Sequence, residues 1–93
     1  MDNVNQRQLV SCARRRVRSQ QLPDHEPEQS WGGLGNGQPC ALCNRPITGS
    51  QIEYEIETAT GAIGFFRFHA ACSLAWRQAC ARRAVEPRSR EPA

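Results

Sequence analysis

Two pairs of potential metal ligands constrain this chain more than any other feature. Cys40 and Cys43 form a Cys-x2-Cys pair, and His69 and Cys72 form a His-x2-Cys pair farther along. Zinc binds thiolates and imidazoles tetrahedrally, and a spacing of two residues lets both members of a pair reach one ion. The pattern predicts one structural zinc held by all four side chains. The alternatives are four unliganded residues or a Cys40–Cys43 disulfide.

The size of the chain makes such a site valuable for folding. The chain has 93 residues, 39% of them hydrophobic, and a core drawn from so few residues is marginal. A structural zinc contributes about 10–16 kcal/mol in small fingers, which is the order of a whole domain's stability. No apolar run approaches the roughly 20 residues of a membrane span, and no signal-peptide core follows the first arginines. With an odd count of five cysteines, we expect a cytoplasmic protein without membrane attachment.

The surroundings of the four residues suit a metal. Asn44 follows the first pair, where a tight turn often requires a left-handed residue, and Asn tolerates that conformation. The second pair suits the start of a helix, whose dipole favours the Cys72 thiolate. Three thiolates and one imidazole give zinc a formal site charge of −1, which Arg45 and Arg67 are placed to offset unless they are ordinary surface arginines.

The patterning predicts four segments. Residues 1–21 contain a basic amphipathic helix, expected over 4–20, with its apolar residues at helical spacing. Residues 22–39 are rich in proline and glycine and are expected to form a linker that Trp31 pins to the domain. Residues 40–85 form the zinc domain, and residues 86–93 a frayed tail. The glycines of the linker do not follow a strand, which argues against a phosphate-binding loop.

Within the zinc domain, alternation predicts a strand with Ile52, Tyr54 and Ile56 on one face and glutamates on the other. A turn near Gly61 returns the chain as a second strand over 63–68. A helix follows from about Ala70 to Val85, with Leu74, Trp76 and Ala79 expected to face the core. The expected fold class is a small zinc-stabilised α+β domain.

A knuckle, a hairpin and a helix that carries the last ligand resemble the treble-clef zinc finger. The order Cys-x2-Cys then His-x2-Cys is also similar to the first half of a LIM domain, although the spacer is longer and the second zinc module is absent. Phe68-His69-x2-Cys72-x3-Trp76, with Trp-Gly-Gly before the knuckle, is similar to small bacterial zinc proteins. The resemblance covers residues 31–80 and implies metal binding, without specifying a task.

Catalysis is not expected at this site. A catalytic zinc usually keeps one position open, whereas four protein donors are present here. The His-x-Glu of zinc deaminases is missing, because His69 is followed by two alanines. Cys80 lies about 12 Å along the helix from Cys72 and is expected to be a small buried residue. Cys12 is expected to pack, with a reactive thiol as the alternative, and His25 to be solvated.

Two functions remain after these exclusions. The favoured one is a protein-interaction, adaptor or regulatory module, which contacts its partner through Leu9 on the helix stripe or through Trp31. In a homodimer, the two copies would meet through this helix. The alternative is a nucleic-acid-binding finger in transcription regulation, because basic residues crowd the same helix. These candidate surface residues are Arg14, Arg15, Arg16 and Arg18. The net charge of only +3 and the glutamate row count against nucleic acid.

Overall fold

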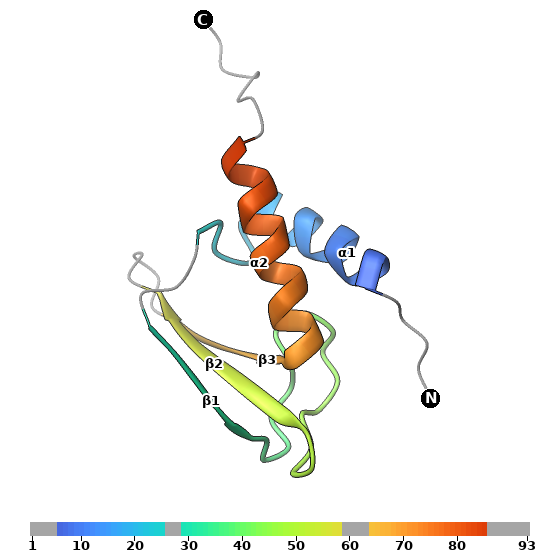
Figure 1. The fold of residues 1–93 in the computed structure, drawn as a ribbon, viewed down its shortest axis with the longest axis vertical. Helices are drawn as coiled ribbons and strands as arrows, with labels where there is room; N and C mark the ends of the chain where they lie inside the picture. Colours follow the sequence, from blue (N-terminus) through green and yellow to red (C-terminus); the bar gives the residue numbers. More distant parts are fainter. Residues whose placement is uncertain (1–5, 26–28, 59–63, 86–93) are drawn as a thin grey trace, which may run out of the picture.

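The described part of the chain folds into helices packed beside one antiparallel sheet. This computed structural model describes residues 6–25, 29–58 and 64–85. In these ranges the element order is α1 (Gln6–Arg18), β1 (Gln29–Leu34), β2 (Ile52–Thr58), β3 (Gly64–His69) and α2 (Ala70–Val85). Figure 1 shows α1 and α2 crossing on one side of the sheet. The small α+β class is therefore confirmed.

Helix α1 packs against α2 rather than projecting from the domain. Its stripe residues Ala13 and Val17 are buried in the core that α2 also enters. The part of the stripe formed by Ala13 and Val17 is therefore covered within the molecule, whereas Leu9 and Val10 are only partly buried. The helix ends at Arg18, two residues before the predicted end, because Gln20 adopts a positive φ of 68°. Residues 4 and 5 of the predicted helix lie outside the described residues.

The linker predicted over 22–39 contains a strand, which corrects that expectation. Residues 29–34 form β1, which pairs antiparallel with β2, so the sheet has the order β1-β2-β3 in the described part of the chain. Trp31 lies in this edge strand with 46% of its surface exposed, so it does not pin a linker. Glycines are poor strand formers by themselves, and β1 is held by its pairing with β2.

The hairpin of β2 and β3 confirms the predicted alternation. Ile56 and Phe68 are fully buried on the face that meets α2, and Phe68 stacks on Trp76 with ring centroids 5.4 Å apart. The turn predicted near Gly61 lies outside the described residues. On the opposite face, Arg67 forms ion pairs with Glu53 (3.5 Å) and Glu55 (3.8 Å).

Helix α2 has the predicted bounds but a different buried face. Trp76 and Ala79 are buried as expected, whereas Leu74 is 51% exposed. Its place is taken by small residues that allow α1 to approach closely; the buried residues of α2 are Cys72, Ser73, Ala75, Trp76, Ala79 and Cys80. Trp76 Nε1 also donates a hydrogen bond to the Pro23 carbonyl (2.9 Å), which ties the segment after α1 to the core. The predicted tail at 86–93 lies outside the described residues.

Candidate metal centre

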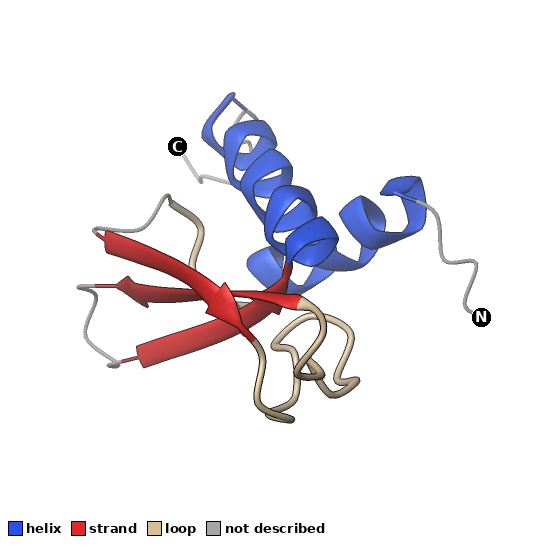
Figure 2. Cartoon of the chain, turned by 60° about the horizontal axis from the view of Figure 1, so that its bottom comes forward, coloured by secondary structure: helices blue, strands red, loops and turns tan. Residues whose placement is uncertain are grey.

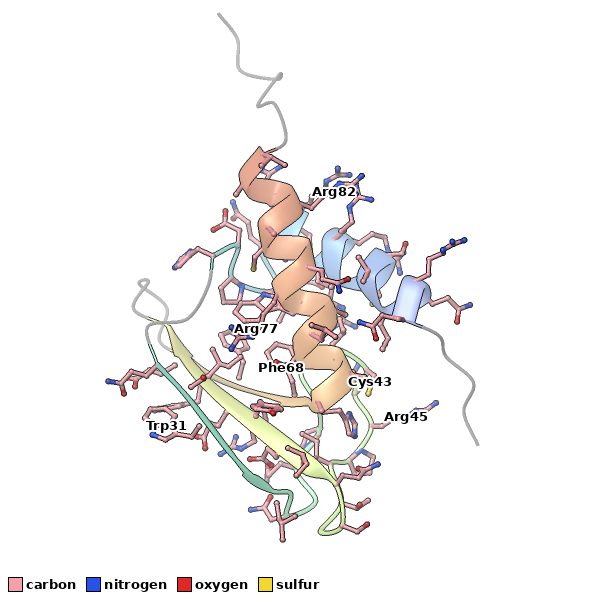
Figure 3. All side chains as sticks on the ribbon, in the orientation of Figure 1. Trp31, Cys43, Arg45, Phe68, Arg77 and Arg82 are labelled. Atoms are coloured by element: carbon pink, nitrogen blue, oxygen red, sulfur yellow. The ribbon has the colours of Figure 1, made fainter. Side chains whose placement is uncertain are left out.

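The four predicted ligands come together at the junction of β3 and α2. Cys40 and Cys43 lie in the turn before β2, His69 ends β3, and Cys72 lies in the first turn of α2. Their donor atoms all lie within 4.8 Å of one another. Figure 2 shows the loops of this region gathered at the end of the sheet beside the helices, and Figure 3 shows Cys43 beside the start of α2.

The geometry of the cluster fits a tetrahedral zinc. Bonds of about 2.3 Å to sulfur place neighbouring donors roughly 3.8 Å apart. Cys43 Sγ lies 3.4 Å from His69 Nδ1, and the whole set closes within 4.8 Å. These residues would hold the ion through three sulfurs and one imidazole nitrogen, a closed donor set typical of structural zinc.

The imidazole of His69 is oriented by a residue outside the ligand motif. Its Nε2 lies 3.2 Å from the Pro46 carbonyl oxygen, which can only accept a hydrogen bond. The proton therefore belongs on Nε2, and the lone pair of Nδ1 points toward the sulfurs. Such a contact fixes the tautomer and the ring orientation of a metal-binding histidine. No spacing rule connects Pro46 with His69, so sequence reasoning missed it.

Backbone geometry holds the first pair as predicted. Asn44 adopts a left-handed φ of 66°, and its N–H donates to the Cys40 carbonyl (2.9 Å). The turn then presents backbone donors to sulfur, and the Leu42 N–H lies 3.4 Å from Cys40 Sγ. The tight turn expected from the position of Asn44 is confirmed.

The ionisation of the three thiols favours a cation among them. A hydrogen bond from the Cys72 thiol, aided by backbone N–H groups, lowers the pKa of Cys40 to about 4. The same hydrogen bond, together with burial and the Cys40 charge, raises the pKa of Cys72. Burial raises the pKa of Cys43. One thiolate thus suppresses ionisation of its neighbours, and a divalent cation would replace the shared protons and allow three thiolates.

The predicted charge-balancing arginines occupy different surroundings. The guanidinium of Arg67 is directed at Glu53 and Glu55, while its carbonyl accepts the Ala41 N–H (2.7 Å). The carbonyl of Arg45 accepts the Cys40 N–H (2.9 Å), and its backbone N–H bonds to the Cys43 sulfur. Both residues therefore support the turn through their backbones.

The candidate surface arginines are not equivalent. Arg15 and Arg18 are exposed on α1 and Arg14 is partly buried. Arg16, by contrast, donates from Nη1 to the Ala41 carbonyl (3.0 Å), a partly buried bond across to the metal-binding turn. Arg16 is thus a link between α1 and the turn rather than a free surface charge, which the run of arginines in the sequence conceals.

The remaining cysteines and His25 lie outside the four-donor set. Cys80 is buried, with Sγ 3.6 Å from the Pro23 carbonyl, as its predicted packing role requires. Cys12 is partly buried and packs against the core. His25 is exposed beside Asp24 (3.1 Å). All five cysteines are free thiols, so the structure shows no Cys40–Cys43 disulfide.

A cavity of about 680 Å³ lies between α1 and the metal centre. Its apolar lining includes Leu9, Leu42 and Pro46, and Arg16 and Arg45 add positive charge. Cys43 and His69, the two more exposed ligands, also border it. Leu9 therefore faces this cavity, whereas Trp31 lies apart from it on β1. In Figure 3 Arg45 points outward from the metal-binding turn, and Trp31 lies on the far side of the sheet.

Comparisons with known proteins do not classify the chain. No family model, curated protein or solved structure matches it. Within the described residues, neither helix has the length and apolar character needed to cross a bilayer. The function is therefore inferred from the metal centre and the surfaces around it.

Proposed function

We propose that this chain is a small non-catalytic zinc-binding protein whose one Cys3His zinc is structural. The observation that carries the proposal is the convergence of four donors from the turn, β3 and α2 within 4.8 Å. A treble-clef-like architecture accounts for this arrangement, since the turn precedes a hairpin and the last ligand begins a helix. The odd cysteine count favours a reducing compartment such as the cytoplasm.

The donor set argues against a zinc enzyme. Catalytic zinc usually has three protein ligands and binds water or substrate at the fourth position. Here Cys40, Cys43, His69 and Cys72 supply all four, and Pro46 directs the His69 lone pair into the set. An ion saturated in this way has no position at which to activate water.

Cobalt substitution tests whether the site is closed. We expect the chain to bind one Co²⁺ with the visible absorption of a tetrahedral thiolate site, unchanged by added azide, because no position is open to an outside ligand. His69→Ala is the matched control, since it opens one position and should make the spectrum respond to azide. A response in the unaltered protein would contradict a structural site.

We further propose that the zinc centre supports a protein-interaction surface at the adjoining cavity. Leu9 and Pro46 supply apolar contact, while Arg16 and Arg45 supply positive charge. This combination suits a partner segment with apolar and acidic side chains, because charge complementarity speeds and orients association. The ion would fix the wall of the cavity, since three of its ligands, Cys43, His69 and Cys72, border that cavity.

Charge reversal separates this proposal from nucleic-acid binding. In cross-linked capture from the native host, we expect Arg45→Glu to reduce recovery of a specific acidic partner at least about tenfold. Arg82→Glu, on the exposed end of α2 away from the cavity, should leave recovery unchanged. Recovery insensitive to Arg45→Glu would contradict the surface. Binding of a DNA or RNA duplex at about 50 mM salt that weakens with Arg15→Glu would support the alternative instead.

A further inference from the structure

Strand β1 is an uncovered edge of the sheet. All six of its residues are exposed, and in the described part of the chain the only other helix or strand that it contacts is β2. Figure 1 shows β1 along the outer border of the molecule. Edge strands are usually protected by charge, proline or a bulge, because their unpaired backbone groups invite another strand. Strand β1 reads Gln-Ser-Trp-Gly-Gly-Leu and has none of these protections.

The register with β2 determines which backbone groups face outward. The Gly35 N–H donates to the Gln51 carbonyl (2.9 Å), and residues 35 and 51 continue the register of the two strands. In antiparallel pairs, residues that bond to the neighbouring strand alternate with residues that do not. Residues 29, 31 and 33 therefore bond to β2. The N–H and C=O groups of Ser30, Gly32 and Leu34 point to the open edge.

We propose that β1 pairs antiparallel with β1 of a second copy of this chain, with Gly32 opposite Gly32 on the two-fold axis. In this register Ser30 lies opposite Leu34 of the second copy, and Leu34 opposite its Ser30. Each of these pairs exchanges two backbone hydrogen bonds. All the outward groups of β1 are thus matched by outward groups of the same strand, and the two sheets join into one.

The side chains of β1 fit the same register. Trp31 lies opposite Gly33 of the second copy, in a non-hydrogen-bonded pair whose Cα atoms are only about 4.5 Å apart. A Cβ at Gly33 would meet nothing within 4 Å, so the space above this glycine is open to an aromatic ring. Aromatic residues stabilise glycines across strands in this way. This dimer would account both for the exposure of Trp31 and for the glycines that follow it.

Charge favours a second copy as the occupant. The strand has no charged residue, so pairing with itself brings no like charges into contact. The other route to self-association, the apolar stripe of α1, is reduced, because Ala13 and Val17 are buried in the core and Leu9 and Val10 are partly buried against it. Because the paired edge is short, we expect a weak dimer, with Kd in roughly the 10 μM to 1 mM range.

Sedimentation equilibrium on the zinc-loaded, reduced chain tests the dimer. Leu34→Pro removes an outward N–H without breaking any bond to β2, and it should raise Kd at least about tenfold. Leu34→Ala keeps that N–H and should change Kd less. A chain that stays monomeric up to about 1 mM would overturn the proposal, even if it binds strands of other proteins. So would a dimer with the same Kd in Leu34→Pro.

Amide exchange in the unaltered protein tests the register independently of any variant. Raising the concentration through Kd should slow exchange at residues 30, 32 and 34, which point to the open edge. The amides of residues 31 and 33 already bond to β2 and should change less. A dimer in which the three outward amides stay unprotected would overturn the β1 assignment. Zinc content, measured separately, is not expected to differ between Leu34→Pro and Leu34→Ala.

Discussion

Cys43→Ser is expected to unfold the domain, whereas Cys12→Ser is expected to leave it folded. Both substitutions replace a partly buried thiol by a hydroxyl, but only Cys43 belongs to the four-donor cluster. A serine hydroxyl stays protonated and is a poor zinc ligand, so the ion is lost or weakly held. Structural zinc contributes about 10–16 kcal/mol, comparable with the whole stability of a small domain.

Circular dichroism and native mass spectrometry measure this result. The unaltered chain and Cys12→Ser should each carry one zinc and melt cooperatively. Cys43→Ser should carry none and lose the near-ultraviolet signal of Trp76, whose ring is fully buried on Phe68. Chelation of the unaltered chain should reproduce the loss. A zinc-free chain with an intact thermal transition would contradict the dependence of this fold on metal.

The ligand set was predictable because it depends on short spacings between residues in the sequence. A spacing of two residues allows both members of each pair to bind the same ion. The asparagine at position 44 indicates the left-handed turn directly in the sequence. The strand of Ile56 and the helix of Trp76 were likewise predictable, since each has the periodicity of its element. These features depend on neighbours in the chain.

The features that could not be predicted depend on distant partners. Strand β1 contains adjacent glycines, which by composition indicate a linker, and only the pairing with β2 makes it a strand. Arg16 resembles its neighbours in the sequence, but the approach of α1 to Ala41 gives it a partly buried hydrogen bond. Leu74 was expected in the core beside Trp76 and Ala79, yet the approach of α1 favours small residues on the buried face of α2, and Leu74 is 51% exposed.

Gly35→Ala is expected to destabilise the domain strongly. The glycines after Trp31 suggest a flexible segment, but Gly35 lies where two backbones meet. A Cβ built there would come 2.3 Å from the Ile47 carbonyl oxygen and 2.5 Å from that of Thr48. Real contacts of this kind do not occur below about 3 Å, so Gly35→Ala must displace backbone next to the metal-binding turn. We expect a loss of about 3 kcal/mol in the free energy of unfolding.

Gly49→Ala is the matched control, because it makes the same change in the facing segment. Its Cβ would meet only the Gly35 carbonyl oxygen at 3.9 Å, an ordinary contact. Denaturant unfolding of the zinc-loaded chain should show a marked fall in midpoint for Gly35→Ala and a change within about 1 kcal/mol for Gly49→Ala. Equal stability of the two variants would mean that the chain does not approach Ile47 closely at Gly35.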